Sequence, residues 1–133
     1  MSSPILPKTT SLKPTRSEQH GEVTFIAGSF VPAGTGTTTP TGVRGDGFTV
    51  TQTASGVFNV ALARRYKETI SFQCTADVAA ETTDVYAQAG DVTAATASAG
   101  EQRVIRTMTG STPTNISTDA APRVHFIFVV RKF

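Results

Sequence analysis

The stretch Arg123-Val-His-Phe-Ile-Phe-Val-Val-Arg-Lys-Phe133 decides the fold that we expect of this chain. Both sets of alternate positions are apolar through its middle: Val124, Phe126, Phe128 and Val130 on one side, and His125, Ile127, Val129 and Arg131 on the other. A strand that is apolar on both faces is usually covered on both faces. We therefore expect an interior strand with a neighbour on each side and with packing over each face.

The composition favours strands over helices. A chain of 133 residues has the size of one domain, and a domain of that length removes roughly two-thirds of its unfolded surface from water. Its 38% hydrophobic and 17% charged residues are an ordinary globular balance. Thr, Ala, Ser and Gly are abundant whereas Leu and Glu are scarce, which suits strands and turns.

The charge is concentrated at the N-terminus. The chain has 12 basic and 10 acidic residues, a formal charge of +2. Residues 1–20 hold Lys8, Lys13 and Arg16 against Glu18 (3 − 1 = +2), which leaves nine basic and nine acidic residues in the remainder. The body is therefore neutral, and we expect no nucleic-acid-binding face on it.

Residues 1–20 read as an extended basic arm that precedes a domain spanning 21–133. Pro4, Pro7 and Pro14 discourage both helix and central strand. Two interpretations stay open: a floppy terminus, or an arm that becomes ordered along a neighbouring subunit. In the second, an apolar pair fills a small pocket and basic groups meet an acidic surface. The candidate anchoring residues are Ile5, Leu6, Lys8, Lys13 and Arg16.

Period-two alternation marks seven strands in the domain. They fall within 22–30, the hairpin 47–62 with two strands, 69–76, 83–90, 102–108 and 123–133. The small-residue stretch 91–100 is either a loop or a short eighth strand at an edge. Long loops at 31–46 and 110–122 allow crossings between sheets. We expect an all-β, jelly-roll-like β-sandwich of seven or eight strands, with a small barrel as the other possibility.

Particular side chains can be assigned within these strands. Phe48 and Phe58 share the buried face of the hairpin, and Gly28 marks a bulge. In 102–108 the strand carries arginines on both faces, Arg103 and Arg106, which suggests a sheet edge or a subunit contact.

The segment 69–76 points Ile70, Phe72 and Cys74 inward. A buried free cysteine is far more often a small hydrophobic residue than a nucleophile, since nothing in the sequence would depress its pKa. It is the only cysteine, so no internal disulfide can form.

No catalytic motif occurs in the chain. The sequence lacks Gly-x-Ser-x-Gly, a Walker loop and His-Glu-x-x-His, and its acids at 46, 77, 84 and 91 lie where turns are expected. With only His20 and His125 beside Cys74, a zinc site is not expected. We expect His125 to have a hydrogen-bond partner at the edge of the core. We therefore assign no catalytic, cofactor-binding or metal-binding residue and expect a protein that is not an enzyme and needs no cofactor.

Two further signals bear on location. The first residues lack the basic and apolar regions of a signal peptide, and no apolar run approaches the roughly 18 residues needed to cross a bilayer. We expect a soluble protein that folds in a reducing cytoplasm, with no membrane partner. The tripeptide Arg44-Gly45-Asp46, which integrins read, is interpreted as a chance match.

Two segments resemble parts of structural proteins of tailed bacteriophages: Gly45-Asp-Gly-Phe-Thr-Val50 with Gly56-Val-Phe-Asn-Val-Ala-Leu62, and Arg123 to Arg131. They are similar to the jelly-roll head decoration, or cement, proteins. The resemblance, over about 21–131, implies a protein on the capsid exterior of the virion that bridges major capsid subunits and carries no catalytic residues. It also fits a homo-oligomer, a dimer or trimer, that associates through exposed strand edges.

Two other classes stay open. One is a ligand-binding jelly-roll module of a phage fibre or tail, which would bind a carbohydrate or a receptor. The absence of Trp argues against it, because sugars stack on aromatic rings. The other is a small enzyme whose site gathers Asp, Arg and His from several loops.

Overall fold

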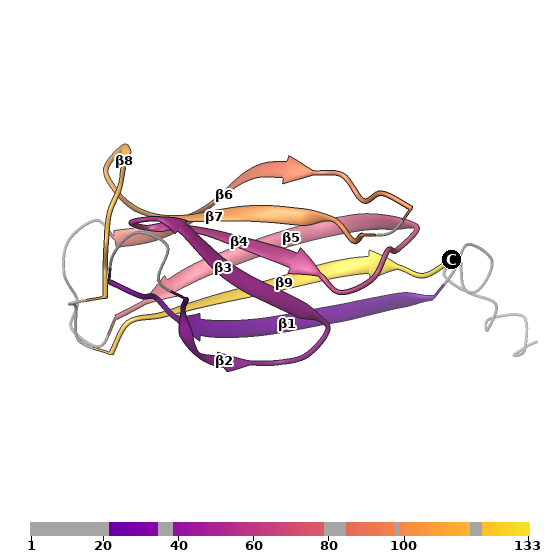
Figure 1. Cartoon of the computed structure of the whole chain (residues 1–133), viewed down its shortest axis with the longest axis horizontal. Coiled ribbons are helices and arrows are strands. Elements are labelled where there is room, and N and C mark those ends of the chain that lie inside the picture. The colour runs from indigo at the N-terminus through magenta and orange to yellow at the C-terminus, as the bar shows by residue number, and fades with distance from the viewer. Residues whose placement is uncertain (1–21, 35–38, 79–84, 98, 118–120) are drawn as a thin grey trace, which may run out of the picture.

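The computed structural model describes residues 22–34, 39–78, 85–97, 99–117 and 121–133. They form two antiparallel sheets that pack face to face (Figure 1). The first sheet has the order β2 (Thr41–Arg44), β1 (Val23–Val31), β9 (Arg123–Arg131), β5 (Glu68–Asp77). The second has the order β3 (Phe48–Ala54), β4 (Val57–Leu62), β7 (Gln102–Thr109), β6 (Val85–Thr93), and the short β8 (Thr112–Pro113) also pairs with β7. All elements in the described residues are strands.

The arrangement of the two sheets confirms an all-β sandwich. The first strand, β1, pairs with the last, β9, while β4 pairs with β7 in the other sheet. The described residues contain nine strands, because β2 and β8 lie inside segments expected to be loops. β6 extends to Thr93, and the described residues between it and β7 are not strand. The connections from β2 to β3 and from β8 to β9 lie in the two expected long loops and cross between the sheets, as predicted. The connections from β4 to β5 and from β5 to β6 also cross.

The terminal strand lies in the interior of its sheet, between β1 and β5, as predicted. Only one of its faces is fully buried: Val124, Phe126, Phe128 and Val130 are at most 4% exposed. The opposite face, which includes Ile127 and Val129, is only half-buried. The expectation that both faces are covered is therefore wrong within the described residues, because the second sheet packs on one side alone.

Aromatic rings from both sheets form the core. Phe30 of β1 packs on Phe58 of β4 with ring centroids 4.9 Å apart, and Phe48 of β3 lies edge-on to Phe126 of β9 at 4.8 Å. Phe58 is 1% exposed and Phe48 packs against the same cluster, so the predicted buried face of the hairpin is confirmed. Each such ring removes a large apolar area from water, which stabilises the contact between the sheets.

Gly28 does not mark a bulge, because the β1–β9 register runs through it without interruption. Its role is to make space for two rings. A Cβ atom there would lie 2.6 Å from Cε1 of Phe48 and 2.8 Å from Cζ of Phe126, which is too close for real contacts. Only glycine lets β1 approach both rings.

One inward prediction on β5 is wrong. A register shift between Thr69 and Ser71 inserts Ile70 as an extra residue, and its side chain is 47% exposed. Beyond the bulge, Phe72 and Cys74 pack against the core as predicted. A bulge reverses the expected side of one residue without disturbing the alternation that follows.

β7 is not at an edge, because β4 and β6 flank it. Its two arginines form ion pairs within the described chain: Nε of Arg103 lies 2.6 Å from Glu101, and Nη2 of Arg106 lies 3.3 Å from Asp91. The Arg103 guanidinium also stacks over the ring of Phe72, 5.6 Å from its centroid. The arginines that suggested an edge are thus accommodated at an interior strand.

Candidate interaction surface

The face of the first sheet that points away from the second sheet carries an apolar strip. We use this name for five residues of β1 and β9: Val23, Phe25, Ala27, Ile127 and Val129. Register pairs place Phe25 beside Val129 and Ala27 beside Ile127. Phe25 is 67% exposed, far more than an aromatic side chain in a strand usually is. Contiguous exposed apolar residues often mark a contact with another molecule.

Ion pairs lie at both ends of the strip. Nε of Arg131 donates to Glu68 across β9 and β5 at 2.7 Å. At the other end of the same two strands, Nε2 of His125 lies 2.8 Å from Oδ2 of Asp77. The expectation that His125 has a hydrogen-bond partner is confirmed. These pairs are partly exposed, so they shape the polar border of the strip more than they stabilise the fold.

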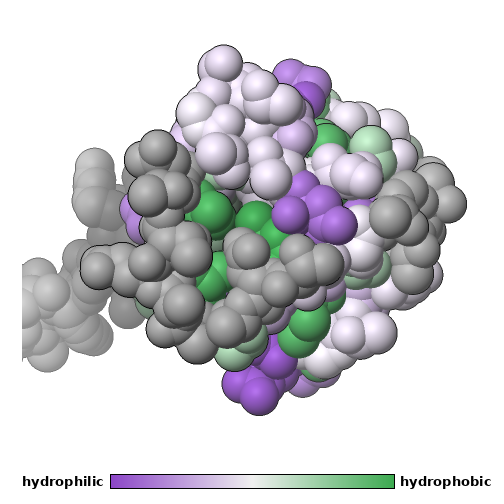
Figure 2. Space-filling view, turned by 90° about the vertical axis from the view of Figure 1, so that its left-hand side faces the viewer, coloured by the Kyte–Doolittle hydropathy of each residue, from purple (hydrophilic) through white to green (hydrophobic). Residues whose placement is uncertain are grey.

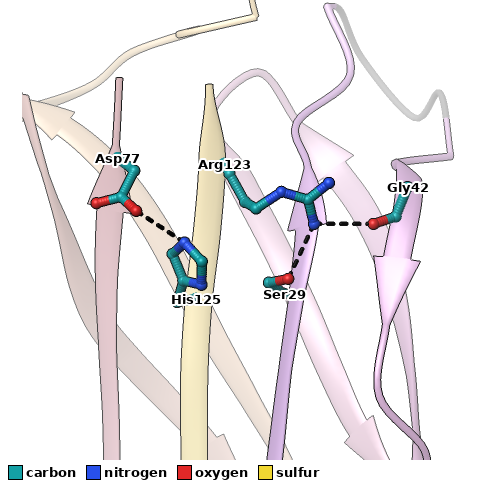
Figure 3. A network of polar contacts seen from close by, with 5 residues as sticks. All are labelled: Ser29, Gly42, Asp77, Arg123 and His125. Atoms are coloured by element: carbon teal, nitrogen blue, oxygen red, sulfur yellow. Dashed lines mark hydrogen bonds and ion pairs between the residues drawn. The ribbon is translucent and has the colours of Figure 1, made fainter. Parts of the chain in front are cut away.

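Arg123 connects three strands next to this border (Figure 3). Its Nη1 donates to Oγ of Ser29 on β1 and to the carbonyl oxygen of Gly42 on β2, both at 2.9 Å. Gly42 has a φ of 58°, a left-handed conformation that favours glycine. The guanidinium therefore holds the short edge strand β2 against the rest of the sheet.

Ser29, His125 and Asp77 lie on neighbouring strands, and they are the residue types of a hydrolase triad. A nucleophilic serine must give its proton to the histidine. Here the Ser29 hydroxyl accepts from Arg123 and makes no hydrogen bond with His125, while Asp77 takes the Nε2 side of the ring. The chain of proton transfer that activates a serine is not assembled.

Two shallow, open depressions lie on this face next to the strip. The larger has a volume of about 300 Å³ and is bordered by Ala27, Ile127 and His125, with Gln73 and Thr75 of β5 on its far side. The second, of about 270 Å³, shares Ala27 and His125 and extends toward β2. Both depressions form where β1 has the small residues Ala27 and Gly28, next to the bulky Phe25.

A separate hollow of about 250 Å³ lies between the β4–β5 crossing and the end of β6. Arg65, which lines the hollow, lies 5.3 Å from the ring centroid of Phe133, and the neighbouring Arg64 lies 5.5 Å from that of Tyr66. The basic cluster of this crossing is thus used to cover aromatic rings.

Burial raises the pKa of the Cys74 thiol from 9.0 to about 11. The thiol therefore stays protonated at neutral pH, and the protonated form is a poor nucleophile. This agrees with its predicted role as a small hydrophobic residue on the inner face of β5.

The predicted anchoring residues Ile5, Leu6, Lys8, Lys13 and Arg16 lie outside the described residues. Among the residues that are described, no cluster of three or more His, Cys, Asp or Glu could hold a metal ion, and no helix is long and apolar enough to span a membrane.

At the end where β1, β5 and β7 finish, the described residues form small separate hydrophobic areas between hydrophilic ones (Figure 2).

Comparison of the chain with protein-family models, with curated proteins and with solved structures finds no match. The function of the chain can therefore be inferred only from its own residues. The sequence did not identify Phe25 as a surface residue. Its alternation with Ile26 marked two possible faces, and only the pairing with β9 shows that Ile26 is the buried one.

Proposed function

We propose that this chain is a non-enzymatic structural protein of a phage virion that decorates the outside of the head. In this role it binds the major capsid protein and stabilises contacts between capsid subunits. The observation that carries the proposal is the apolar strip: a rigid two-sheet body exposes Phe25 and its neighbours on a face bordered by ion pairs, which suits a protein that works within an assembly of protein subunits. Such an apolar centre with a polar border is the usual anatomy of a protein–protein contact.

The basic arm supplies a second, independent contact. Three of the four charges in residues 1–20 are positive, and we assign Lys8, Lys13 and Arg16 to an acidic patch of the capsid, with Ile5 and Leu6 in a small pocket. Repetition of modest contacts over a capsid lattice raises the overall affinity through avidity. Neither nucleic acid nor a membrane is required as a partner in this scheme.

Removal of the arm tests the proposal. We expect the deletion of residues 2–18 to lower the number of copies bound per purified head by at least roughly tenfold, because the attachment becomes monovalent. Reversal of one exposed charge on the body, Lys67→Glu, is the matched control and should leave occupancy unchanged. Undiminished occupancy of the deletion variant would refute the anchoring role, and failure of the intact protein to bind any head would refute the function.

A ligand-binding module of a phage fibre or tail is the second candidate. The depression of about 300 Å³ favours it, because Gln73, Thr75 and His125 place polar groups beside an apolar floor at Ile127. Pockets for sugars combine these features. Glycan-array binding that is lost in Gln73→Ala would support this candidate, and an array without signal would remove it.

A further inference from the structure

A knob and a hollow lie side by side on the apolar strip. Phe25 and Ala27 are two residues apart on β1 and point to the same face, so their Cα atoms are roughly 6.6 Å apart along the strand. Phe25 projects into solvent with 67% of its surface exposed. Ala27 borders the depression of about 300 Å³. An enclosed apolar cavity of roughly 150 Å³ binds benzene. The depression is larger but open, so it can receive one face of a phenyl ring.

The strand edges are less suited to association than this face. Each edge strand of the two sheets has a register irregularity: β2 opposite Ser29–Val31, β3 between Gln52 and Ala54, β5 between Thr69 and Ser71, and β6 between Ala89 and Val92. Bulges at an edge interrupt the row of backbone groups that another strand would need. Association is thus directed away from the edges and toward the sheet face.

We propose that two copies of this chain associate face to face through the apolar strip, with Phe25 of each copy in the depression beside Ala27 of the other. A two-fold axis produces this arrangement if it lies between the facing sheets of the two copies and runs across their strands. It must also pass midway between residues 25 and 27 of β1. The same surface then serves both copies, as in an isologous dimer. The pairs Arg131–Glu68 and His125–Asp77 form the polar border at the two ends.

The size of the face sets the strength of the dimer. Three strands of this sheet are roughly 30 Å long and β2 is roughly 13 Å long, so at a spacing of roughly 4.8 Å they cover about 500 Å² per copy, or about 1,000 Å² for both. That is about the smallest area expected of a biological interface. The dissociation constant should therefore lie in the micromolar range, and the dimer should dissociate on dilution.

The two-fold geometry makes an unusual prediction about substitutions. Phe25→Ala removes the knob and Ala27→Phe fills the hollow, so each alone should weaken dimerisation by at least roughly tenfold. The double variant F25A/A27F exchanges the positions of the knob and the hollow on β1. Because residue 25 of one copy faces residue 27 of the other, the exchange restores one knob opposite one hollow, and dimerisation should recover.

Sedimentation velocity across the micromolar range, without heads, measures these effects for the full chain and is independent of capsid binding. Circular dichroism verifies that each variant is folded. Val92→Asp, at a residue 50% exposed on β6 of the other sheet, is the matched control and should dimerise normally. A monomeric wild-type protein at all concentrations would overturn the proposal, as would single variants that dimerise normally or a double variant that does not recover.

Deletion of residues 2–18 shows whether a second copy, the arm of the same chain or the capsid covers the apolar strip. If the arm of the same chain covered the strip, the intact protein would be monomeric and the deletion variant would dimerise, which overturns the proposal. If only the capsid covered it, both would be monomeric and Phe25→Ala would reduce head binding alone, which also overturns it. Equal dimerisation of the intact and deleted proteins supports the second copy as the occupant.

Discussion

The packing around Gly28 predicts that one added methyl group, Gly28→Ala, destabilises the protein. The new Cβ atom would lie 2.6 Å from Cε1 of Phe48 and 2.8 Å from Cζ of Phe126, whereas ordinary contacts begin near 3.4 Å. Cζ of Phe48 would be closer still, so the Phe48 ring would have to move by more than 0.8 Å (3.4 − 2.6) and the Phe126 ring by about 0.6 Å (3.4 − 2.8). They lie edge-on at a centroid distance of 4.8 Å, so neither can move without disturbing the other.

The expected cost follows from two opposing effects. Overfilling a close-packed core costs roughly 1–3 kcal/mol. Replacing glycine by alanine also restricts the unfolded chain, which contributes roughly 0.4–1 kcal/mol in the opposite direction. We expect Gly28→Ala to lower the free energy of unfolding by about 1–2 kcal/mol, which corresponds to a Tm lower by roughly 4–8 °C for a chain of this length.

Urea unfolding followed by far-ultraviolet circular dichroism measures this change, since the chain has no Trp for fluorescence. The same substitution in a Phe48→Leu background should cost less, with a coupling free energy of roughly 1 kcal/mol between the two positions. Gly34→Ala is the matched control, because the nearest described atom to its Cβ, Oγ of Ser117 at 3.3 Å, is the end of a short side chain that needs to shift by only about 0.1 Å (3.4 − 3.3). A Gly28→Ala variant as stable as the wild type would show that the rings do not pack against this strand.

Two further predictions concern the thiol and the edge strand. At pH 8 Cys74 should react with a disulfide reagent roughly 100-fold more slowly in the folded than in the unfolded protein, because two pKa units separate about 11 from 9.0. The pKa of the Cys74 thiol is higher in the folded than in the unfolded protein, so its contribution to the free energy of unfolding is fully present below pH 9 and is lost as the pH rises toward 11. A Cys74→Ser variant with the same loss of stability between pH 9 and 11 would contradict the burial of this thiol. Arg123→Gln should lower stability by roughly 1–2 kcal/mol and speed amide exchange in β2, since the hydrogen bonds to Ser29 and Gly42 are lost. Arg123→Lys should rescue it only in part, and unchanged exchange in β2 would refute the role of the guanidinium.

Local patterns predicted the elements that depend on neighbours in sequence. The hairpin of β3 and β4 needs only alternating residues and a turn that ends in Gly56, whose φ is 72°. The last strand is apolar on both faces through its middle, which correctly placed it inside a sheet. β2 and β8 were missed because each is too short to show alternation, and each forms only because a longer strand pairs with it.

The candidate surface could not be predicted from the same patterns. Phe25 and Ile26 are both large and apolar, and period two puts them on opposite faces without indicating which face meets the other sheet. Ile70 pointed outward because of a bulge that only the pairing with β9 reveals. The depression beside Ala27 arises from side chains of three strands that are distant in the sequence.

The sequence by itself determined the strand content, the positions of most strands and the concentration of net positive charge in residues 1–20, because alternation and charge are properties of consecutive residues. Only the tertiary structure decided which side of each strand is buried and which residues meet across strands. The second sheet covers one face of the first and leaves Phe25, Ile127 and Val129 on the other. Burial depends on partners brought together by folding, and no local pattern records them.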